Sequence, residues 1–204
     1  GSGDGSFAAA ANSAAGSGVT KVAIGDLNND GLLDLAVSNF GTSSAAVLRG
    51  NGDGTFQTPT NYGANSGNVR SVGLADLNGD GRLDLAMTRE FGNRVSVLLG
   101  IGEGYFGPEV NYNVTGIPNS IAIEDLNGDG RPDLAVATFG GGDVSIVMNQ
   151  SQSIQIGSQP VSQTLAPGAT ATFISTVSGN GSSTLQWRRN GVPLINGDVY
   201  SGVT

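Results

Sequence analysis

A nine-residue segment with three carboxylates occurs three times in the chain. The copies span residues 26–34, 76–84 and 125–133, and they read Asp-Leu-Asn-Asn-Asp-Gly-Leu-Leu-Asp, Asp-Leu-Asn-Gly-Asp-Gly-Arg-Leu-Asp and Asp-Leu-Asn-Gly-Asp-Gly-Arg-Pro-Asp. Asp stands at the first, fifth and ninth positions of every copy, Asn at the third and Gly at the sixth. Side-chain oxygens therefore alternate with other residues, and a glycine marks the point at which the chain must turn sharply.

This pattern has the chemistry of a site for a hard divalent cation. Calcium takes about six to eight oxygen ligands at about 2.3–2.6 Å, and a backbone carbonyl at the seventh position together with water can complete the shell. Three carboxylates held so close repel one another and raise the pKa of at least one of them, and a bound cation removes that conflict. The alternative is a polar turn rich in Asp, Asn and Gly. The threefold recurrence favours the metal site.

The elements that hold these segments repeat with them. The segments start 50 and then 49 residues apart, a period typical of solenoids and propellers. Two other landmarks keep the same phase. They are a Gly-acid-Gly-x-Phe turn at residues 3–7, 52–56 and 102–106, and a Phe-Gly pair at residues 40–41, 91–92 and 139–140.

Apolar residues alternate on both sides of each segment. In the first copy Val22 and Ile24 precede the segment, and Leu33, Leu35 and Val37 end it and follow it. A third apolar run lies at residues 45–48, 95–99 and 144–148, and a weaker fourth run follows each Gly-acid-Gly-x-Phe turn. Period-2 alternation between glycine-rich turns predicts short strands. Four short strands in about 50 residues form one blade of a β-propeller.

These motifs resemble the FG-GAP or VCBS repeat of integrin-α-like β-propellers over roughly residues 1–148. The resemblance implies that each nine-residue loop joins the first two strands of a blade and binds one calcium ion, about three in all. The ligands that it implies are Asp26, Asn28, Asp30, the Leu32 carbonyl and Asp34; Asp76, Asn78, Asp80, the Arg82 carbonyl and Asp84; and Asp125, Asn127, Asp129, the Arg131 carbonyl and Asp133. EF-hand and dockerin loops do not fit, because both need an acid at position 12, where this chain has Val37, Met87 and Val136.

The number of blades is too small for a closed ring. Propellers usually have four to eight blades, and this chain supplies about three. We expect that further blades precede Gly1, since the chain lacks an initial Met and ends soon after a second domain opens. Association of copies to complete the ring is the alternative. Residues 1–20 should then supply an outer strand. The array should end at Met148, because no Gly-acid-Gly-x-Phe turn follows it.

The composition changes after the repeats. Residues 149–158 read as a Ser/Gln/Gly linker, and residues 159–204 resemble the first half of a bacterial Ig-like domain. Trp187 matches the buried strand-C tryptophan of such domains, Asn190-Gly191 the following hairpin turn, and Ser175 the strand-B position at which disulfide-linked members have Cys. The alternative for Trp187 is any half-buried strand aromatic. The predicted fold class is thus all-β: a partial β-propeller of about three four-stranded blades, then an incomplete Ig-like β-sandwich segment.

Composition excludes several function classes. The net charge is −8, and nine of the 17 acidic residues lie in the three loops, so three calcium ions would leave about −2. The nine basic residues form no stripe for nucleic acid. Without His or Cys there is no Ser-His or Cys-His nucleophile pair and no His-ligated metal site. No apolar run reaches the ~20 residues of a membrane span.

The sequence therefore predicts a calcium-binding, non-enzymatic module. Extracellular calcium modules bind at about 10⁻⁴–10⁻³ M, which favours an exported protein, secreted or at the cell surface. We expect a role in adhesion or lectin-like recognition of an unknown protein or glycan ligand. Asn39, Arg89, Glu90 and Arg94 are candidate contact residues, although solvated turn residues are the simpler interpretation. The alternative is an accessory, non-catalytic domain of a secreted polysaccharide-degrading enzyme. Glu124, beside the third loop, is expected to be an added outer carboxylate.

Overall fold

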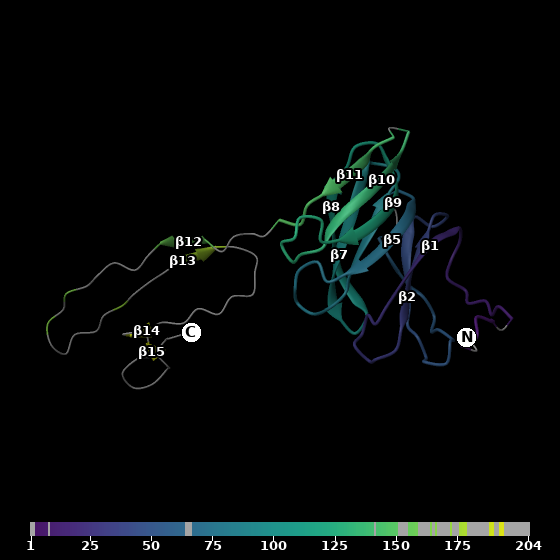
Figure 1. Ribbon diagram of the computed structural model, residues 1–204, viewed down its shortest axis with the longest axis horizontal. Coiled ribbons are helices and arrows are strands. Elements are labelled where there is room, and N and C mark those ends of the chain that lie inside the picture. The colour runs from purple at the N-terminus through teal and green to yellow at the C-terminus, as the bar shows by residue number, and fades with distance from the viewer. Residues whose placement is uncertain are drawn as a thin grey trace. The chain divides into compact units, whose positions relative to one another are not determined.

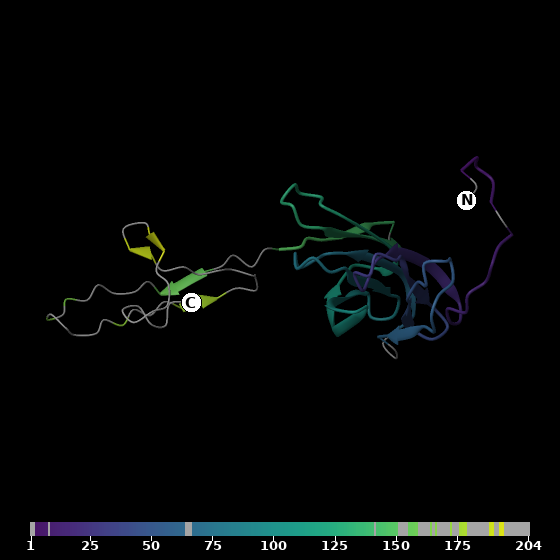
Figure 2. The same ribbon diagram turned by 90° about the horizontal axis from the view of Figure 1, so that it is seen from below.

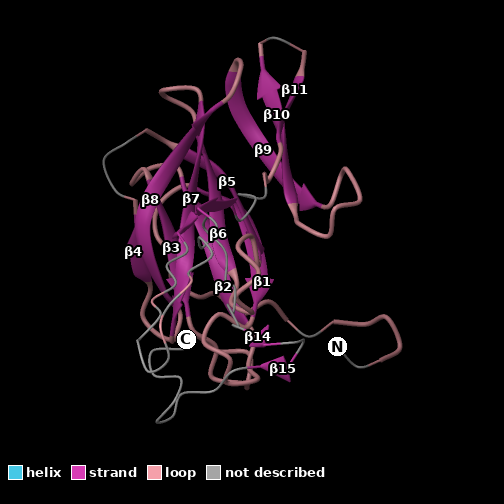
Figure 3. Ribbon diagram, turned by 90° about the vertical axis from the view of Figure 1, so that its left-hand side faces the viewer, coloured by secondary structure: helices cyan, strands magenta, loops and turns pink. Residues whose placement is uncertain are grey.

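The structure is a computed structural model that divides into two units, Gly1–Asn149 and Gln150–Thr204. It describes residues 3–7, 9–63, 67–140 and 142–150, and in the second unit residues 155–158, 164, 166, 172, 176–178, 188–189 and 192–193. All regular elements in these ranges are strands (Figure 3). The described residues thus include no helix that could cross a membrane, and the all-β prediction is confirmed.

The first unit consists of three antiparallel sheets (Figure 1). The first sheet contains β1 (Val19–Gly25), β2 (Asp34–Asn39), β3 (Ser44–Leu48) and β4 (Thr60–Tyr62). The second contains β5 (Val69–Ala75), β6 (Asp84–Arg89), β7 (Arg94–Gly102) and β8 (Tyr105–Asn113). The third contains β9 (Ile117–Glu124), β10 (Asp133–Phe139) and β11 (Val144–Val147). Neighbours in sequence are neighbours in each sheet, as in propeller blades.

The strand register places the nine-residue loops. Gly25 pairs with Asp34, Ala75 with Asp84, and Glu124 with Asp133. Each loop therefore starts immediately after the first strand of a sheet, and its ninth residue opens the second strand. The expected connection is confirmed in all three sheets.

Apolar side chains pack between successive sheets. One buried cluster joins Leu27, Ala36 and Val47 of the first sheet to Val72 and Met87 of the second. A second cluster joins the second sheet to the third and includes Ala86, Val95, Val97, Ile121, Leu134 and Val136. Ala36 and Ala86, in the middle of β2 and β6, are fully buried in these clusters and let the next sheet approach closely.

The segment before β1 differs from the expectation. No strand occurs among the described residues before Val19, so an outer strand in residues 1–20 is not observed there. The stretch is rich in Gly, Ser and Ala and has no apolar alternation. Its last residues instead form hydrogen bonds with the first sheet: Asn39 Nδ2 donates to the Ala15 carbonyl (2.8 Å), and the Phe40 amide donates to the Gly18 carbonyl (3.1 Å).

The second unit contains four described strands in two pairs. They are β12 (Gln155–Ser158) with β13 (Thr176–Ser178), and β14 (Arg188–Arg189) with β15 (Val192–Pro193). β12 occupies the last four residues of the stretch predicted as a linker. β14 and β15 flank the Asn190-Gly191 pair at which a hairpin turn is predicted. Ser175 and Trp187 lie outside the described residues.

Two of the candidate ligand-contact residues are buried, which makes that expectation wrong for them. Asn39 and Arg89 have no exposed surface. The Arg89 guanidinium donates to Glu109 Oε2 (2.7 Å), to Ser96 Oγ (3.2 Å) and to the Ser43 carbonyl (2.9 Å) of the first sheet. Burial lowers the pKa of Arg89, and the Glu109 carboxylate opposes that shift. Arg89 therefore connects two sheets, and its charge is compensated inside the protein.

Arg89→Ala should destabilise the first unit strongly. The substitution leaves the Glu109 carboxylate without its partner and Ser43 without its donor, and breaking a buried pair costs about 3–5 kcal/mol. Urea unfolding followed by circular dichroism measures the loss. The matched control is Arg70→Ala, which breaks the more exposed pair with Glu90 (2.7 Å) and should cost no more than about 1 kcal/mol. Equal losses in the two variants would contradict a structural role for Arg89.

Candidate metal-binding loops

The first-position carboxylate closes each loop on itself. Asp26 accepts hydrogen bonds from the amides of Asp30 (3.2 Å) and Gly31 (2.8 Å). Asp76 and Asp125 do the same with the amides of Asp80 and Gly81, and of Asp129 and Gly130. The glycine at the sixth position has a φ of 82–84° in the three loops, in the left-handed region that favours glycine. The amide of Gly130, foremost among several, lowers the pKa of Asp125.

The third- and fifth-position side chains lie together at the exposed end of the loop. Asn28 Nδ2 donates to Asp30 Oδ2 (2.7 Å), and Asp30 Oδ1 accepts from the Leu32 amide (2.8 Å). The same pair of bonds occurs at Asn78, Asp80 and Arg82 and at Asn127, Asp129 and Arg131. The structure therefore brings the first, third and fifth residues of each loop together, as expected from the sequence.

The ninth-position carboxylate has a different role. Asp34, Asp84 and Asp133 are fully buried. Asp34 accepts from the amide of Leu27 (2.9 Å), which is the second residue of the first loop, and from the amide of Gly50 (2.8 Å), which lies just beyond β3. Asp84 accepts from Leu77 and Gly100, and Asp133 from Leu126 and Asn149. Each of these carboxylates thus fastens the start of its loop to the far end of the third strand.

Burial acts most clearly on the second of these carboxylates. Desolvation raises the pKa of Asp84, and the amides of Gly100 and Leu77 oppose that shift. The approach of the chain at this point is close, since a Cβ at Gly100 would lie 2.5 Å from the Leu83 carbonyl oxygen. A side chain at this position would therefore disturb the backbone that donates to Asp84.

The donor set of each loop fits a hard cation in its chemistry, though the three carboxylates do not converge. Among the described residues no three acidic side chains form a group that could hold a metal ion. The inward turn of the ninth carboxylate separates it from the first and fifth. The remaining donors are two carboxylates, the third-position amide and the seventh-position carbonyl. Water or a rotated ninth carboxylate would have to complete the six to eight oxygens that calcium takes.

The seventh position distinguishes the loops. The Arg82 guanidinium forms an ion pair with Asp80 (2.5 Å) and donates to the Gly100 carbonyl (2.8 Å). Arg131 pairs with Asp129 (2.6 Å) and donates to the Asn149 carbonyl (3.3 Å). The first loop has Leu32 instead. The sequence predicted these residues only as ligands through their backbone carbonyls. This prediction missed that two of them place a guanidinium group against the loop. An Arg two residues after an Asp was the sequence signal that could have indicated this ion pair.

Several carboxylates outside the loops are engaged in structural contacts. Asp53 accepts from the amide (2.9 Å) and hydroxyl (2.6 Å) of Thr55, and Asp4 makes the same two bonds to Ser6. These bonds close the Gly-acid-Gly-x-Phe turns and lower the pKa of both acids. Glu90 accepts from Arg70 (2.7 Å) and from Asn68 Nδ2 (3.2 Å). Its carboxylate therefore also has structural partners, at the edge of its own sheet.

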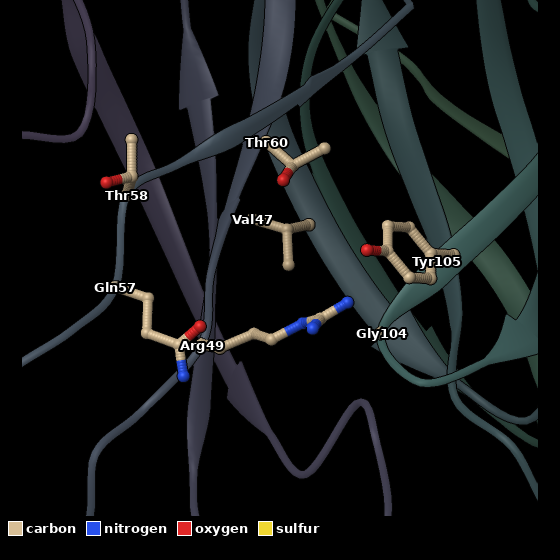
Figure 4. A pocket seen from close by; sticks show the side chains of 7 residues that line it. All are labelled: Val47, Arg49, Gln57, Thr58, Thr60, Gly104 and Tyr105. Atoms are coloured by element: carbon tan, nitrogen blue, oxygen red, sulfur yellow. The ribbon is translucent and has the colours of Figure 1, made fainter.

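A small cavity of about 170 Å³ lies between the first sheet and the β7–β8 turn (Figure 4). Its lining residues are Val47, Arg49, Gln57, Thr58, Thr60, Gly104 and Tyr105. The Arg49 guanidinium lies 4.6 Å from the centre of the Tyr105 ring and donates to the Glu103 carbonyl. That ring face is therefore covered, and it does not offer a free surface on which a sugar could stack.

Comparison with known proteins agrees with the geometry of the first unit. Residues 26–87 match the FG-GAP-like repeat family, and residues 118–147 match the FG-GAP repeat family. These ranges include all three loops. No curated protein matches the chain. The VCBS and Ig-like resemblances stay predictions. Two segments of the chain therefore match FG-GAP repeats, and its three antiparallel sheets are consistent with a partial β-propeller.

Proposed function

We propose that the first unit is a calcium-binding propeller module of an exported protein, in which each loop holds one structural calcium ion. The observation that carries this proposal is the identical placement of three oxygen-bearing side chains at the exposed end of all three loops. Asp26, Asn28 and Asp30 represent the arrangement. The first-position carboxylate is already fixed by backbone amides, which reduces the cost of ordering the loop around an ion.

Calcium would neutralise charge that the fold itself gathers. At about 2 mM calcium and a dissociation constant of about 10⁻⁴ M, one site adds roughly 1.8 kcal/mol to the free energy of unfolding. Together, three such sites would contribute close to half the net free energy of unfolding of a small domain. Sites of this affinity fill outside the cell, which supports export to the cell surface or the medium.

The biological role that we propose is adhesion or recognition of a protein or glycan ligand. FG-GAP repeats are typically non-catalytic and are common in extracellular and surface proteins. The acids outside the loops support this role because several already have structural partners: Glu90 pairs with Arg70, and Glu109 with Arg89. Neither is free to act in a carboxylate pair.

The first measurement is a calcium titration by calorimetry on the chelator-stripped chain, with a melting curve at both ends. We expect about three ions per chain and a higher melting temperature in calcium, because the ions bind only the folded loops. The same titration with magnesium is the control, since Mg²⁺ demands a stricter octahedral geometry and dehydrates reluctantly. No binding and an unchanged melting temperature would show that the loops are polar turns closed by hydrogen bonds alone.

Two substitutions in the second loop should separate ion binding from folding. Asp84→Asn places an amide against two backbone donors and should cost about 1.5–3 kcal/mol even in chelator, the value of a charged hydrogen bond. Asp80→Asn changes an exposed side chain and should cost at most about 1 kcal/mol in chelator, while calcium binding falls by one ion. Urea unfolding and calorimetry on both variants give the two readouts. An Asp80→Asn variant that still binds three ions would contradict the ligand assignment.

The recognition role is tested on the full chain with glycan arrays and immobilised surface proteins, in calcium and in chelator. We expect binding that chelator weakens, since removal of the proposed ions would leave the carboxylates of each loop repelling one another and lower the stability of the module. Polysaccharide hydrolysis assays on the same samples serve as the comparison. Turnover of a polysaccharide by this chain would contradict the proposal.

A further inference from the structure

The two end sheets of the first unit each have an apolar patch open to solvent. The front patch lies on the first sheet and its loop and consists of Val22, Ile24 and Leu33, which are 45, 60 and 64% exposed. The back patch lies on the third sheet and its loop and consists of Leu126, Val144 and Ile146, which are 50, 61 and 49% exposed. In Figure 2 the third sheet, in green, lies above the teal strands of the second sheet.

The equivalents of the front patch are covered in the other two sheets. The repeat offsets of 50 and 49 residues make Val72 and Ile121 the counterparts of Val22, and both are buried. Leu74 and Leu83 of the second sheet and Ile123 of the third, counterparts of Ile24 and Leu33, pack against the clusters between sheets. The front of each later sheet is thus buried against the sheet before it.

The equivalents of the back patch are covered in the same way. Leu27, Ala45 and Val47 of the first sheet, counterparts of Leu126, Val144 and Ile146, are buried in the first cluster. Val95 and Val97 of the second sheet are buried in the second cluster, and Leu77 packs against it. The front and back patches are therefore the two halves of one interface, which the chain forms twice within itself.

We propose that copies of this chain associate head to tail, with the back patch of one copy against the front patch of the next. The two internal interfaces provide the template, since β5 packs on β1 and β9 packs on β5. Every copy carries both halves, so a second copy is a complete partner. The contact is heterologous. It closes into a ring where the rotation between sheets permits and otherwise extends as a filament.

One residue weakens the fit. Glu124 of the third sheet stands where the first two sheets have Gly25 and Ala75. At Gly25 even a Cβ would lie 2.5 Å from Leu83 Cδ1 of the next sheet. In the associated pair Leu33 of the second copy would occupy the place of Leu83, so the Glu124 side chain has to turn aside. The association is therefore weaker than the internal interfaces, and removal of this carboxylate should strengthen it.

The test is sedimentation equilibrium on the full chain in calcium, from about 1 μM to about 1 mM. Wild type should assemble as concentration rises. Ile24→Glu destroys the front patch and Ile146→Glu the back patch, and each should raise the dissociation constant at least about tenfold. Val110→Glu is the matched control, because Val110 on β8 is 50% exposed and belongs to neither patch; it should assemble like wild type.

The mixture of the two patch variants identifies the geometry. Ile24→Glu keeps an intact back and Ile146→Glu an intact front, so an equimolar mixture should form a heterodimer that grows no further. A pair of identical patches would give no such rescue. Glu124→Ala should lower the dissociation constant about tenfold. Circular dichroism and melting curves show whether each variant is folded.

Three results would overturn the proposal. They are a wild type that stays monomeric up to about 1 mM, a mixture without heterodimer, and a Glu124→Ala variant that associates no better than wild type. A monomeric wild type would mean that the patches are covered by something other than a second copy, such as further blades of a longer chain, and either of the other two results would mean that the contact differs from the internal interfaces.

Discussion

The bond between a buried aspartate and two backbone amides is the constraint on which each sheet depends. In the second sheet Asp84 receives the amides of Leu77 and Gly100. One amide lies at the start of the loop between the first two strands, and the other lies at the end of the third strand. Three chain segments distant in sequence therefore meet at one carboxylate. Because loss of this group would leave both amides without an acceptor, the buried amide of Gly100 among them, it would cost more than one ordinary hydrogen bond.

The contacts between sheets depend on this internal order. A sheet whose loop and third strand are held together presents a regular apolar face, and small residues such as Ala36 and Ala86 let the next sheet approach. Arg89 adds a polar link, since it reaches from β6 to the Ser43 carbonyl of the preceding sheet. A long cationic side chain is tolerated there because Glu109 and Ser96 satisfy it. Each sheet is therefore held together internally by its buried carboxylate, and small residues and Arg89 connect it to the neighbouring sheet.

The repeat made most of the first unit predictable. Period-2 alternation places the strands, and the Asp and Gly positions place the loops, because both signals are local in sequence. The direction of the ninth carboxylate was not predictable in this way. A pattern of side-chain oxygens does not show which of them points to solvent and which to a backbone amide 16 residues away, as between Asp34 and Gly50. The burial of Arg89 was missed for the same reason, since its partners Ser43 and Glu109 lie in other strands. The segment before Val19 was misjudged because a Gly-acid-Gly-x-Phe turn alone does not make the following residues a strand.

The loops also differ in the charge that a bound cation would neutralise. In each loop the hydrogen bonds of the first and ninth carboxylates hold the backbone in shape, so an ion would act mainly on charge. Arg82 and Arg131 already neutralise one carboxylate in the second and third loops. The first loop has the same three carboxylates and Leu32 in place of the arginine. Its uncompensated charge is larger by one unit, and a charge at short range near the surface is worth a few kcal/mol at most. The electrostatic gain from the proposed calcium ion would therefore be greatest in the first loop, although all three loops share one backbone design.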